Sequence, residues 1–165
     1  MCQMIYAKRC LGQDGKIINI YKFRTMHPGA HERLEEVAVN GFDSLGKVKN
    51  DPRITPIGKF LRKYWIDELP QIYNLARGDI KLVGIRPMSE SDWMKYPPVI
   101  MERSLRQKPG LIGFNYAFEP SDDFENKFEH IKIYLDQWER DPVATDQEFL
   151  LRVIENIVFR GVRSS

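Results

Sequence analysis

Hydrophobic residues follow two different spacings along the chain, and each spacing predicts a different kind of element. Short apolar, β-branched stretches at 3–6 and 17–23 flank a glycine-containing turn sequence at 12–15. This arrangement predicts a β-hairpin. A further apolar stretch at 80–83 predicts another strand, and the Gly-Ile-Arg-Pro sequence after it predicts a loop.

Helical spacing is clearest in the middle of the chain. An apolar stripe follows Pro56, a residue that suits a first helical turn, and it comprises Ile57, Phe60, Leu61, Tyr64 and Trp65. A second helix is predicted from Asp67 to about Ala76, because Gly78 then ends it.

Three further segments have helical patterns. The segment at 30–39 follows a Pro-Gly break, the segment at 124–138 is charged and amphipathic, and the segment at 149–159 follows a capping-box sequence at 145–148. A polar, glycine-containing loop is predicted at 40–49. Together these elements predict an α+β fold, in which one mostly helical domain over residues 1–165 contains a small β-hairpin or sheet.

Composition agrees with a single folded domain and narrows the function classes. The chain has 165 residues, of which 42% are hydrophobic and 29% charged. No apolar run approaches the ~20 residues that span a bilayer, and the first residues lack the apolar core of a signal peptide. We therefore expect attachment to a membrane surface at most. Cys2 and Cys10 show no zinc or redox spacing, which favours reduced thiols in a cytosolic setting.

Charge is unevenly distributed although the formal net charge is only +2. The segment at 47–63 contains six basic residues and one acidic residue, Asp51. This predicts a face that binds anions such as phosphates or acidic lipids. A nucleic-acid-binding module is the alternative, but the modest net charge and the absence of a reading motif predict no nucleic-acid partner.

The adjacent carboxylates of Asp67 and Glu68 are the residues best suited to chemistry. Two neighbouring carboxylates can share a divalent cation, or one can attack while the other binds the metal or moves a proton. A helix N-terminus would favour an ionised Asp67 and would also attract a phosphate. From this pair alone a capping role explains Asp67 equally well, because aspartate is a favoured helix cap.

Two arginines are candidates to bind a phosphate beside these carboxylates. Arg62 lies one turn before them, and Arg86 lies in the loop after the predicted strand at 80–83. An arginine fork holds phosphate oxygens in a bidentate fashion and supplies positive charge for phosphoryl transfer. The structural alternatives are a solvated helix face for Arg62 and a loop-fixing role for Arg86.

Three more basic residues are candidates of the same kind. Strand alternation places Lys22 and Arg24 on one face at the end of the hairpin, where they could line an anion site. The alternative is an edge strand protected by charge. Arg53 follows Asp51 in a rigid turn and either belongs to the site or forms a local ion pair. The histidines show no metal-ligand spacing. The segment at 93–98 mixes aromatic residues with lysine and is a candidate to lie on a membrane or to pack as a surface loop.

Four motifs occur in order along the first half of the chain: KFRTM, DPRITPIGKFLRKYWIDELPQ, NLARGD and VGIRP. Together they resemble the bacterial sugar transferases, the monotopic polyprenyl-phosphate phosphoglycosyl transferases that begin glycan assembly. The resemblance is dense from about Ile5 to Pro87 and looser through Pro109 to the last helix.

This resemblance implies a specific reaction. A sugar 1-phosphate passes from a UDP-sugar to a polyprenyl phosphate, which initiates exopolysaccharide, O-antigen or glycoprotein glycan assembly. Asp67 matches the family's nucleophile, which displaces UMP and carries the phosphosugar covalently. Glu68 matches its partner carboxylate, and both carboxylates are the implied ligands of Mg²⁺. The implied substrate- and phosphate-binding residues are Arg62, Arg86, Lys22, Arg24 and Arg53.

The resemblance also implies a location and shows three departures. Members attach to the cytoplasmic face of the bacterial inner membrane through amphipathic surface helices and an N-terminal hydrophobic helix. This chain shows no such N-terminal helix and is expected to be soluble if the helix is truly absent. Ile85 replaces the first proline of a Pro-Arg-Pro sequence, and Ile112 replaces a threonine. The alternative function is a truncated, non-catalytic relative that binds a membrane or a partner protein.

Overall fold

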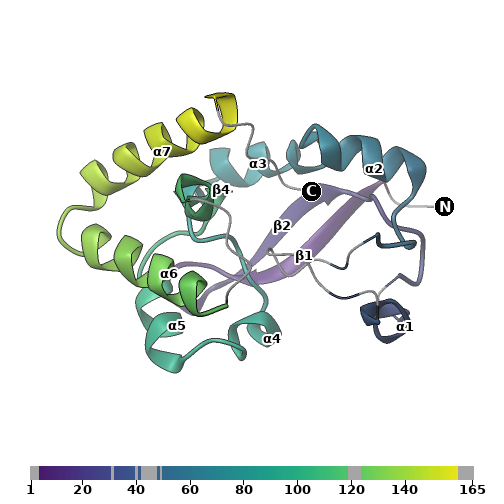
Figure 1. The fold of residues 1–165 in the computed structure, drawn as a ribbon, viewed down its shortest axis with the longest axis horizontal. Helices are drawn as coiled ribbons and strands as arrows, with labels where there is room; N and C mark the ends of the chain where they lie inside the picture. Colours follow the sequence, from purple (N-terminus) through teal and green to yellow (C-terminus); the bar gives the residue numbers. More distant parts are fainter. Residues whose placement is uncertain are drawn as a thin grey trace.

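The computed structural model describes residues 4–30, 32–39, 41, 48, 50–118 and 124–159. Most of the loop predicted at 40–49 lies outside these residues, as do Cys2, His31, Lys47 and Lys49. The described part is an α+β fold in which helices surround two small sheets (Figure 1). The predicted fold class is therefore confirmed.

The predicted hairpin is present. Strands β1 (Ile5–Leu11) and β2 (Ile17–Phe23) pair antiparallel, with Ile5 opposite Phe23 and Leu11 opposite Ile17. The turn between them contains a short 3-10 helix, η1 (Gln13–Gly15). β1 extends further than predicted because Lys8 and Arg9 interrupt its apolar pattern without ending the pairing.

The second sheet pairs two strands in parallel, β3 (Lys81–Gly84) and β4 (Gly110–Gly113). β3 begins one residue later than the predicted strand. β4 was not predicted, because two glycines leave it only two side chains. A Cβ added to Gly110 would lie 2.2 Å from the backbone nitrogen of Gly84, so this close approach requires glycine.

The helices agree with the prediction to different degrees. They are α1 (Leu34–Ala38), α2 (Pro56–Lys63), η2 (Ile66–Glu68), α3 (Gln71–Ala76), α4 (Glu90–Trp93), α5 (Pro98–Ser104), η3 (Phe114–Ala117), α6 (Phe124–Trp138) and α7 (Pro142–Phe159). α6 has the predicted bounds, whereas α4 and α5 were not predicted. The capping-box prediction at 145–148 was wrong: α7 begins earlier, where the Asp141 Oδ1 accepts a 3.0 Å hydrogen bond from the Ala144 N–H.

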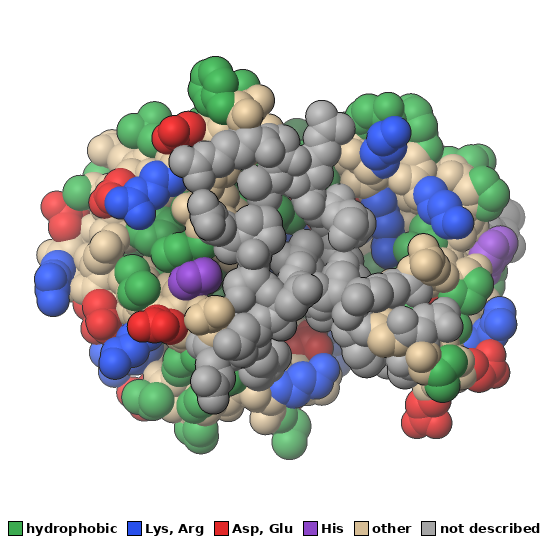
Figure 2. All heavy atoms as spheres, in the orientation of Figure 1, with side chains coloured by type: hydrophobic (Ala, Val, Ile, Leu, Met, Phe, Trp, Pro, Cys, Tyr) green, Lys and Arg blue, Asp and Glu red, His purple; other side chains and the backbone are tan. Residues whose placement is uncertain are grey.

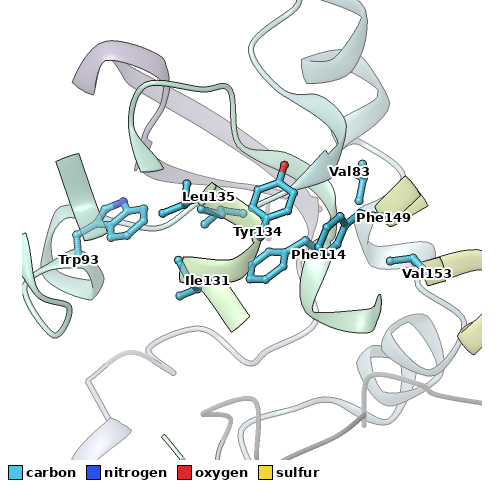
Figure 3. Packing of buried hydrophobic residues seen from close by; sticks show 9 residues of the cluster. Val83, Trp93, Phe114, Ile131, Tyr134, Leu135, Phe149 and Val153 are labelled. Carbon is cyan, nitrogen blue, oxygen red and sulfur yellow. The ribbon is translucent and has the colours of Figure 1, made fainter. Parts of the chain in front are cut away.

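The main core lies between β3, η3 and the paired helices α6 and α7 (Figure 3). The rings of Phe114 and Tyr134 stack with their centroids 4.7 Å apart, and Phe149 meets Tyr134 edge-on at 4.9 Å. Trp93 belongs to this core and is 3% exposed. The membrane-surface interpretation of 93–98 was therefore wrong for Trp93, because its indole packs inside the protein.

A polar cluster joins β3 to the last two helices. The Lys81 Nζ donates 2.7 Å hydrogen bonds to both carboxylate oxygens of Asp146 in α7. It also lies 3.1 Å from the hydroxyl of Tyr134 in α6. This cluster fixes the strand that leads to Arg86 against α7.

Helices α2, α3 and α7 lie along one long side of the molecule (Figure 1). The apolar stripe of α2 faces outward, since Ile57 is 73% and Phe60 57% exposed. Figure 2 shows hydrophobic side chains projecting from this side over α2 and the end of α7. We define the exposed apolar edge as the outward hydrophobic residues of this side, Ile57, Phe60, Tyr64, Leu69, Ile72, Tyr73, Leu151, Ile154, Val158 and Phe159. Within the described ranges, no helix is long and apolar enough to cross a bilayer.

Candidate active site

The chain turns sharply between α2 and η2, at the point where the two carboxylates begin. Trp65 makes this turn with a left-handed backbone, φ 56°, which is uncommon for a bulky residue. Asp67 follows within η2 and is 8% exposed. The residues at the capping positions are Trp65 before η2 and Pro70 before α3, and neither makes a side-chain cap bond. The capping interpretation of Asp67 is therefore wrong.

Glu68 is held by two cations from separate parts of the chain. The Arg86 guanidinium approaches both carboxylate oxygens in a bidentate pair, with Nη1 2.9 Å from Oε2. The Lys22 Nζ donates a 3.0 Å hydrogen bond to Oε1. Burial acts to raise the pKa of Glu68, but the charges and hydrogen bonds of Arg86 and Lys22 outweigh it and lower the pKa to about 2. Glu68 is therefore ionised at neutral pH.

Arg86 reaches this site because the chain leaves β3 at Gly84 and turns back over β4. Its guanidinium also donates to the carbonyl oxygen of Leu111 in β4. Burial acts to lower the pKa of Arg86, but the Glu68 carboxylate outweighs this effect, so the pKa is raised overall. Ile85, one of the departures from the family pattern, is buried in the core directly before Arg86.

Asp67 lies in a different electrostatic environment from its neighbour. Burial raises the pKa of Asp67, and the negative charge of Glu68 raises it further. The positive charges of Lys22 and Arg62 oppose this shift. A carboxylate with a raised pKa is the stronger base and nucleophile once ionised, and the two cations stabilise that ionised form.

Arg62 is positioned by the end of strand β2. Its Nε donates a 2.9 Å hydrogen bond to the Thr25 Oγ1. The Thr25 carbonyl oxygen in turn accepts hydrogen bonds from the backbone and the hydroxyl of Thr55, the N-cap of α2. Sequence alternation gave Thr25 no role, because it placed Thr25 on the face opposite Lys22 and Arg24.

The structure thus brings together Lys22, Arg62, Asp67, Glu68 and Arg86. Three cations and two carboxylates meet from β2, α2, η2 and the loop after β3. A pyrophosphate group would find complementary charge here.

Arg53 and Arg24 have other partners. Arg53 is buried, and it donates to both carboxylate oxygens of Asp51, at 2.8 and 2.6 Å, and to the carbonyl oxygen of Ala30. This is the local ion pair that the sequence left open. From this position the positive charge of Arg53 acts to lower the pKa of Arg62. The guanidinium of Arg24 lies 5.7 Å from the centroid of the Tyr6 ring.

A largely apolar pocket of about 190 Å³ adjoins Glu68 and Arg86. The remaining wall residues are Trp65, Leu69, Ile72, Leu111, Ile112 and Tyr116. The pocket could not be predicted from the sequence, because its wall residues lie in or beside η2, α3, β4 and η3.

Two carboxylates, Asp67 and Glu68, are available to a metal ion at this site. Over the described ranges, no group of three or more His, Cys, Asp or Glu side chains is placed to hold a metal ion. Magnesium in phosphoryl-transfer sites is commonly bound by one or two carboxylates together with substrate phosphates. A magnesium ion here would therefore need phosphate oxygens of the substrate to complete its ligand set.

Comparison with known proteins identifies relatives. The sequence profile of the family described as bacterial sugar transferase matches residues 1–160. A galactosyl transferase, CpsE, from Streptococcus agalactiae is 36% identical over 139 residues, which cover 81% of this chain and 30% of that protein. An undecaprenyl-phosphate galactose phosphotransferase from Salmonella typhimurium is 36% identical over 141 residues, covering 81% and 28%. A UDP-glucose:undecaprenyl-phosphate glucose-1-phosphate transferase from Klebsiella pneumoniae is 32% identical over 166 residues, covering 96% and 32%. The chain therefore spans about a third or less of these relatives' length.

Proposed function

The chain belongs to the bacterial sugar transferase family, and we propose that it transfers a sugar 1-phosphate from a UDP-sugar to a polyprenyl phosphate at the Asp67–Glu68 site. The observation that carries this proposal is the placement of Asp67. Its carboxylate is nearly buried, its pKa is raised by that burial, and Lys22 and Arg62 supply opposing charge. The names of the Salmonella and Klebsiella relatives describe transfer of this kind for those proteins.

In the first step a carboxylate oxygen of Asp67 attacks the phosphorus that bears the sugar. The bond from this phosphorus to the oxygen bridging the two phosphates of the UDP-sugar breaks, and UMP leaves with that oxygen and its electron pair. The phosphosugar is then esterified to Asp67 as an acyl phosphate. Splitting the transfer in this way lets one site serve a water-soluble donor and a lipid acceptor in turn.

In the second step a phosphate oxygen of the polyprenyl phosphate attacks the same phosphorus. The bond between that phosphorus and the Asp67 oxygen breaks, which restores the free carboxylate. The product is a polyprenyl diphosphate sugar. This product would initiate exopolysaccharide, O-antigen or glycoprotein glycan assembly.

The cations have separate roles in this scheme. Arg62 lies on the Asp67 side and neutralises charge that develops on the attacked phosphate. Lys22 and Arg86 hold Glu68 and offer their charge to the second phosphate. Arg53 has its donors held by Asp51 and Ala30, so we propose that it only adds positive charge near Arg62, whose pKa it lowers. Arg24 is proposed to attract the anionic donor from the end of β2.

We propose that Mg²⁺ binds together with the substrate phosphates at Asp67 and Glu68. When bound, the ion would neutralise phosphate charge and make UMP a better leaving group. Glu68 is ionised, and a bound ion would share its carboxylate oxygens with Arg86 and Lys22.

We further propose that the exposed apolar edge rests on the bilayer that supplies the acceptor. Solvent-exposed hydrophobic residues on a continuous face mark surfaces that bind lipid or protein. On α2 the apolar residues alternate with Lys59 and Lys63, which suit anionic headgroups. We propose that this bilayer is the bacterial inner membrane and that the edge contacts its cytoplasmic leaflet, the location that the family resemblance implies.

The nucleophile is tested by Asp67→Asn. The chain with Mg²⁺, a UDP-sugar and a polyprenyl phosphate should release UMP, and Asp67→Asn should abolish that release. Asp14→Asn is the matched control, because Asp14 is an exposed turn residue in a backbone conformation that asparagine tolerates. Mass spectrometry without acceptor should find one phosphosugar on the peptide containing Asp67. Normal turnover by Asp67→Asn would refute the assignment, and vesicle binding without any UMP release would instead support the non-catalytic alternative.

A further inference from the structure

The apolar pocket beside Glu68 and Arg86 has walls of two chemical kinds. Glu68 and Arg86 supply a carboxylate and a guanidinium, and Lys22 bonds to that carboxylate. The remaining walls are hydrocarbon and aromatic, and include Leu69 and Ile72. A ligand complementary to both kinds of wall has a phosphate attached to an apolar chain.

Two wall residues of the pocket also belong to the exposed apolar edge. Leu69 and Ile72 line the pocket, and they are 52% and 56% exposed at the surface. Both residues belong to the face that we propose meets the bilayer. An apolar chain can therefore pass from the lipid into the pocket without being exposed to water. A polar ligand would gain nothing from such a route.

The size and the walls of the pocket favour a short branched hydrocarbon. An aliphatic cavity of about 150 Å³ is enough to bind benzene, so about 190 Å³ accommodates a five-carbon unit. The rings of Trp65 and Tyr116 touch at a centroid distance of 5.9 Å and a 57° tilt, which leaves no slot for a planar base between them. Most of the wall is hydrocarbon, which offers sugar hydroxyls few polar partners.

We propose that this pocket holds the isoprene unit nearest the phosphate of the acceptor lipid and thereby selects prenyl phosphates. The inference rests on the proposed function and adds Trp65, Ile112 and Tyr116 as residues that determine acceptor specificity. Ile112 contributes an aliphatic side chain to this wall, in agreement with a hydrocarbon occupant.

The test measures binding rather than turnover, with farnesyl phosphate as the probe and calorimetry as the readout. Ile112→Ser should weaken farnesyl phosphate about tenfold, because it removes several buried carbon atoms from the wall. Ile112→Val keeps the wall apolar and should retain most of the affinity. Val99→Ser alters an exposed residue on α5, away from the pocket, and should change nothing. Trp65→Gly removes a second wall while accepting the positive φ, and it should weaken binding as Ile112→Ser does.

Control ligands measure the contributions of the phosphate and of the hydrocarbon chain separately. Farnesol lacks the phosphate and inorganic phosphate lacks the chain, so each should bind more weakly than farnesyl phosphate. Equal affinity for farnesol would overturn the role of the cations. Unchanged farnesyl phosphate affinity in Ile112→Ser, or a loss of UMP affinity in its place, would overturn the assignment of the pocket. A chain that binds farnesyl phosphate through Ile112 but releases no UMP would refute the transfer reaction and leave this inference intact.

Discussion

The Nε of Arg62 donates a 2.9 Å hydrogen bond to the Thr25 hydroxyl, so one of the two cations whose charge acts on the proposed nucleophile is oriented by a residue distant in sequence. Thr25 is buried, and its carbonyl oxygen also binds the first turn of α2. One residue therefore sets both the position of the helix and the direction of its arginine.

Replacing the Thr25 hydroxyl should impair the reaction with little effect on the fold. Thr25→Val keeps the shape but leaves the Arg62 Nε without this acceptor, which should lower kcat/KM for the UDP-sugar about tenfold. Thr25→Ser restores the hydroxyl and should recover most of that loss. Steady-state UMP release measures the effect, and a thermal melt of each variant checks folding. Equal losses in the valine and serine variants would show that packing, not the hydrogen bond, matters here.

Gly58 should not tolerate alanine although it lies in a helix. Alanine normally stabilises a helix interior by about 1 kcal/mol relative to glycine. Here the added Cβ would lie 2.1 Å from the Thr25 carbonyl oxygen, so α2 must shift. We expect Gly58→Ala to destabilise the protein by about 2 kcal/mol in urea unfolding. The neighbouring exposed Lys59→Ala is the control and should be nearly neutral.

Stability should depend on pH through Asp92. Burial acts to raise the pKa of Asp92, but hydrogen bonds from Lys8 and Ser89 lower it to about 2. Because the folded pKa lies below the unfolded one, the stabilisation is present above about pH 4 and is lost as the pH falls toward about 2. The group is partly exposed and therefore screened, so we expect Asp92→Asn to cost about 1 kcal/mol at pH 7 and almost nothing at low pH.

Urea unfolding at pH 7, 4 and 2.5 measures this difference. Glu90→Gln changes an exposed carboxylate on the same helix and serves as the control. A destabilisation of Asp92→Asn that stays constant across this range would show that its ionisation is not responsible.

Vesicle binding should depend on the exposed apolar edge and not on the segment at 93–98. Ile57→Ser with Phe60→Ser should weaken binding to vesicles containing anionic lipid at least about tenfold, since both side chains project outward. Met94→Ser with Val99→Ser is a matched pair of exposed positions near α4 and α5, on the opposite side of the molecule (Figure 1). Co-sedimentation compares the two. The reverse pattern would move the lipid contact to 93–98.

Elements with regular side-chain patterns were predictable, and those built from backbone contacts were not. The hairpin follows from its turn and its β-branched strands, and α6 follows from its amphipathic period. β4 escaped prediction because two of its four residues are glycines, which leaves no side-chain pattern to detect. Gly110 lets the Gly84 backbone approach, and Gly113 leaves room for the side chains of Asn115 and Arg86. The start of α7 was missed because Thr145 and Asp146 resemble a cap, whereas Asp141 provides it.

The site shows the same division. Arg62, Asp67 and Glu68 lie close together in the sequence, so their proximity could be predicted, although the turn at Trp65 places them in two separate helical elements. The pairing of Glu68 with Arg86 could not, because it depends on how the loop after β3 crosses η2. The sequence allowed a local ion pair between Asp51 and Arg53 as one alternative. The fold shows that this pair forms and that it occupies the arginine's Nε and Nη2 donors.

The ion pair between Lys81 and Asp146 has a mechanical consequence. Lys81 begins the strand that precedes Arg86, and Asp146 belongs to α7, the helix that carries the exposed residues Leu151 and Phe159. If that helix lies on the bilayer, the ion pair between β3 and α7 sets the depth of Arg86 relative to the lipid headgroups. The protein itself would then set the height at which Arg86 meets the lipid phosphate, and the thickness of the membrane would not change it.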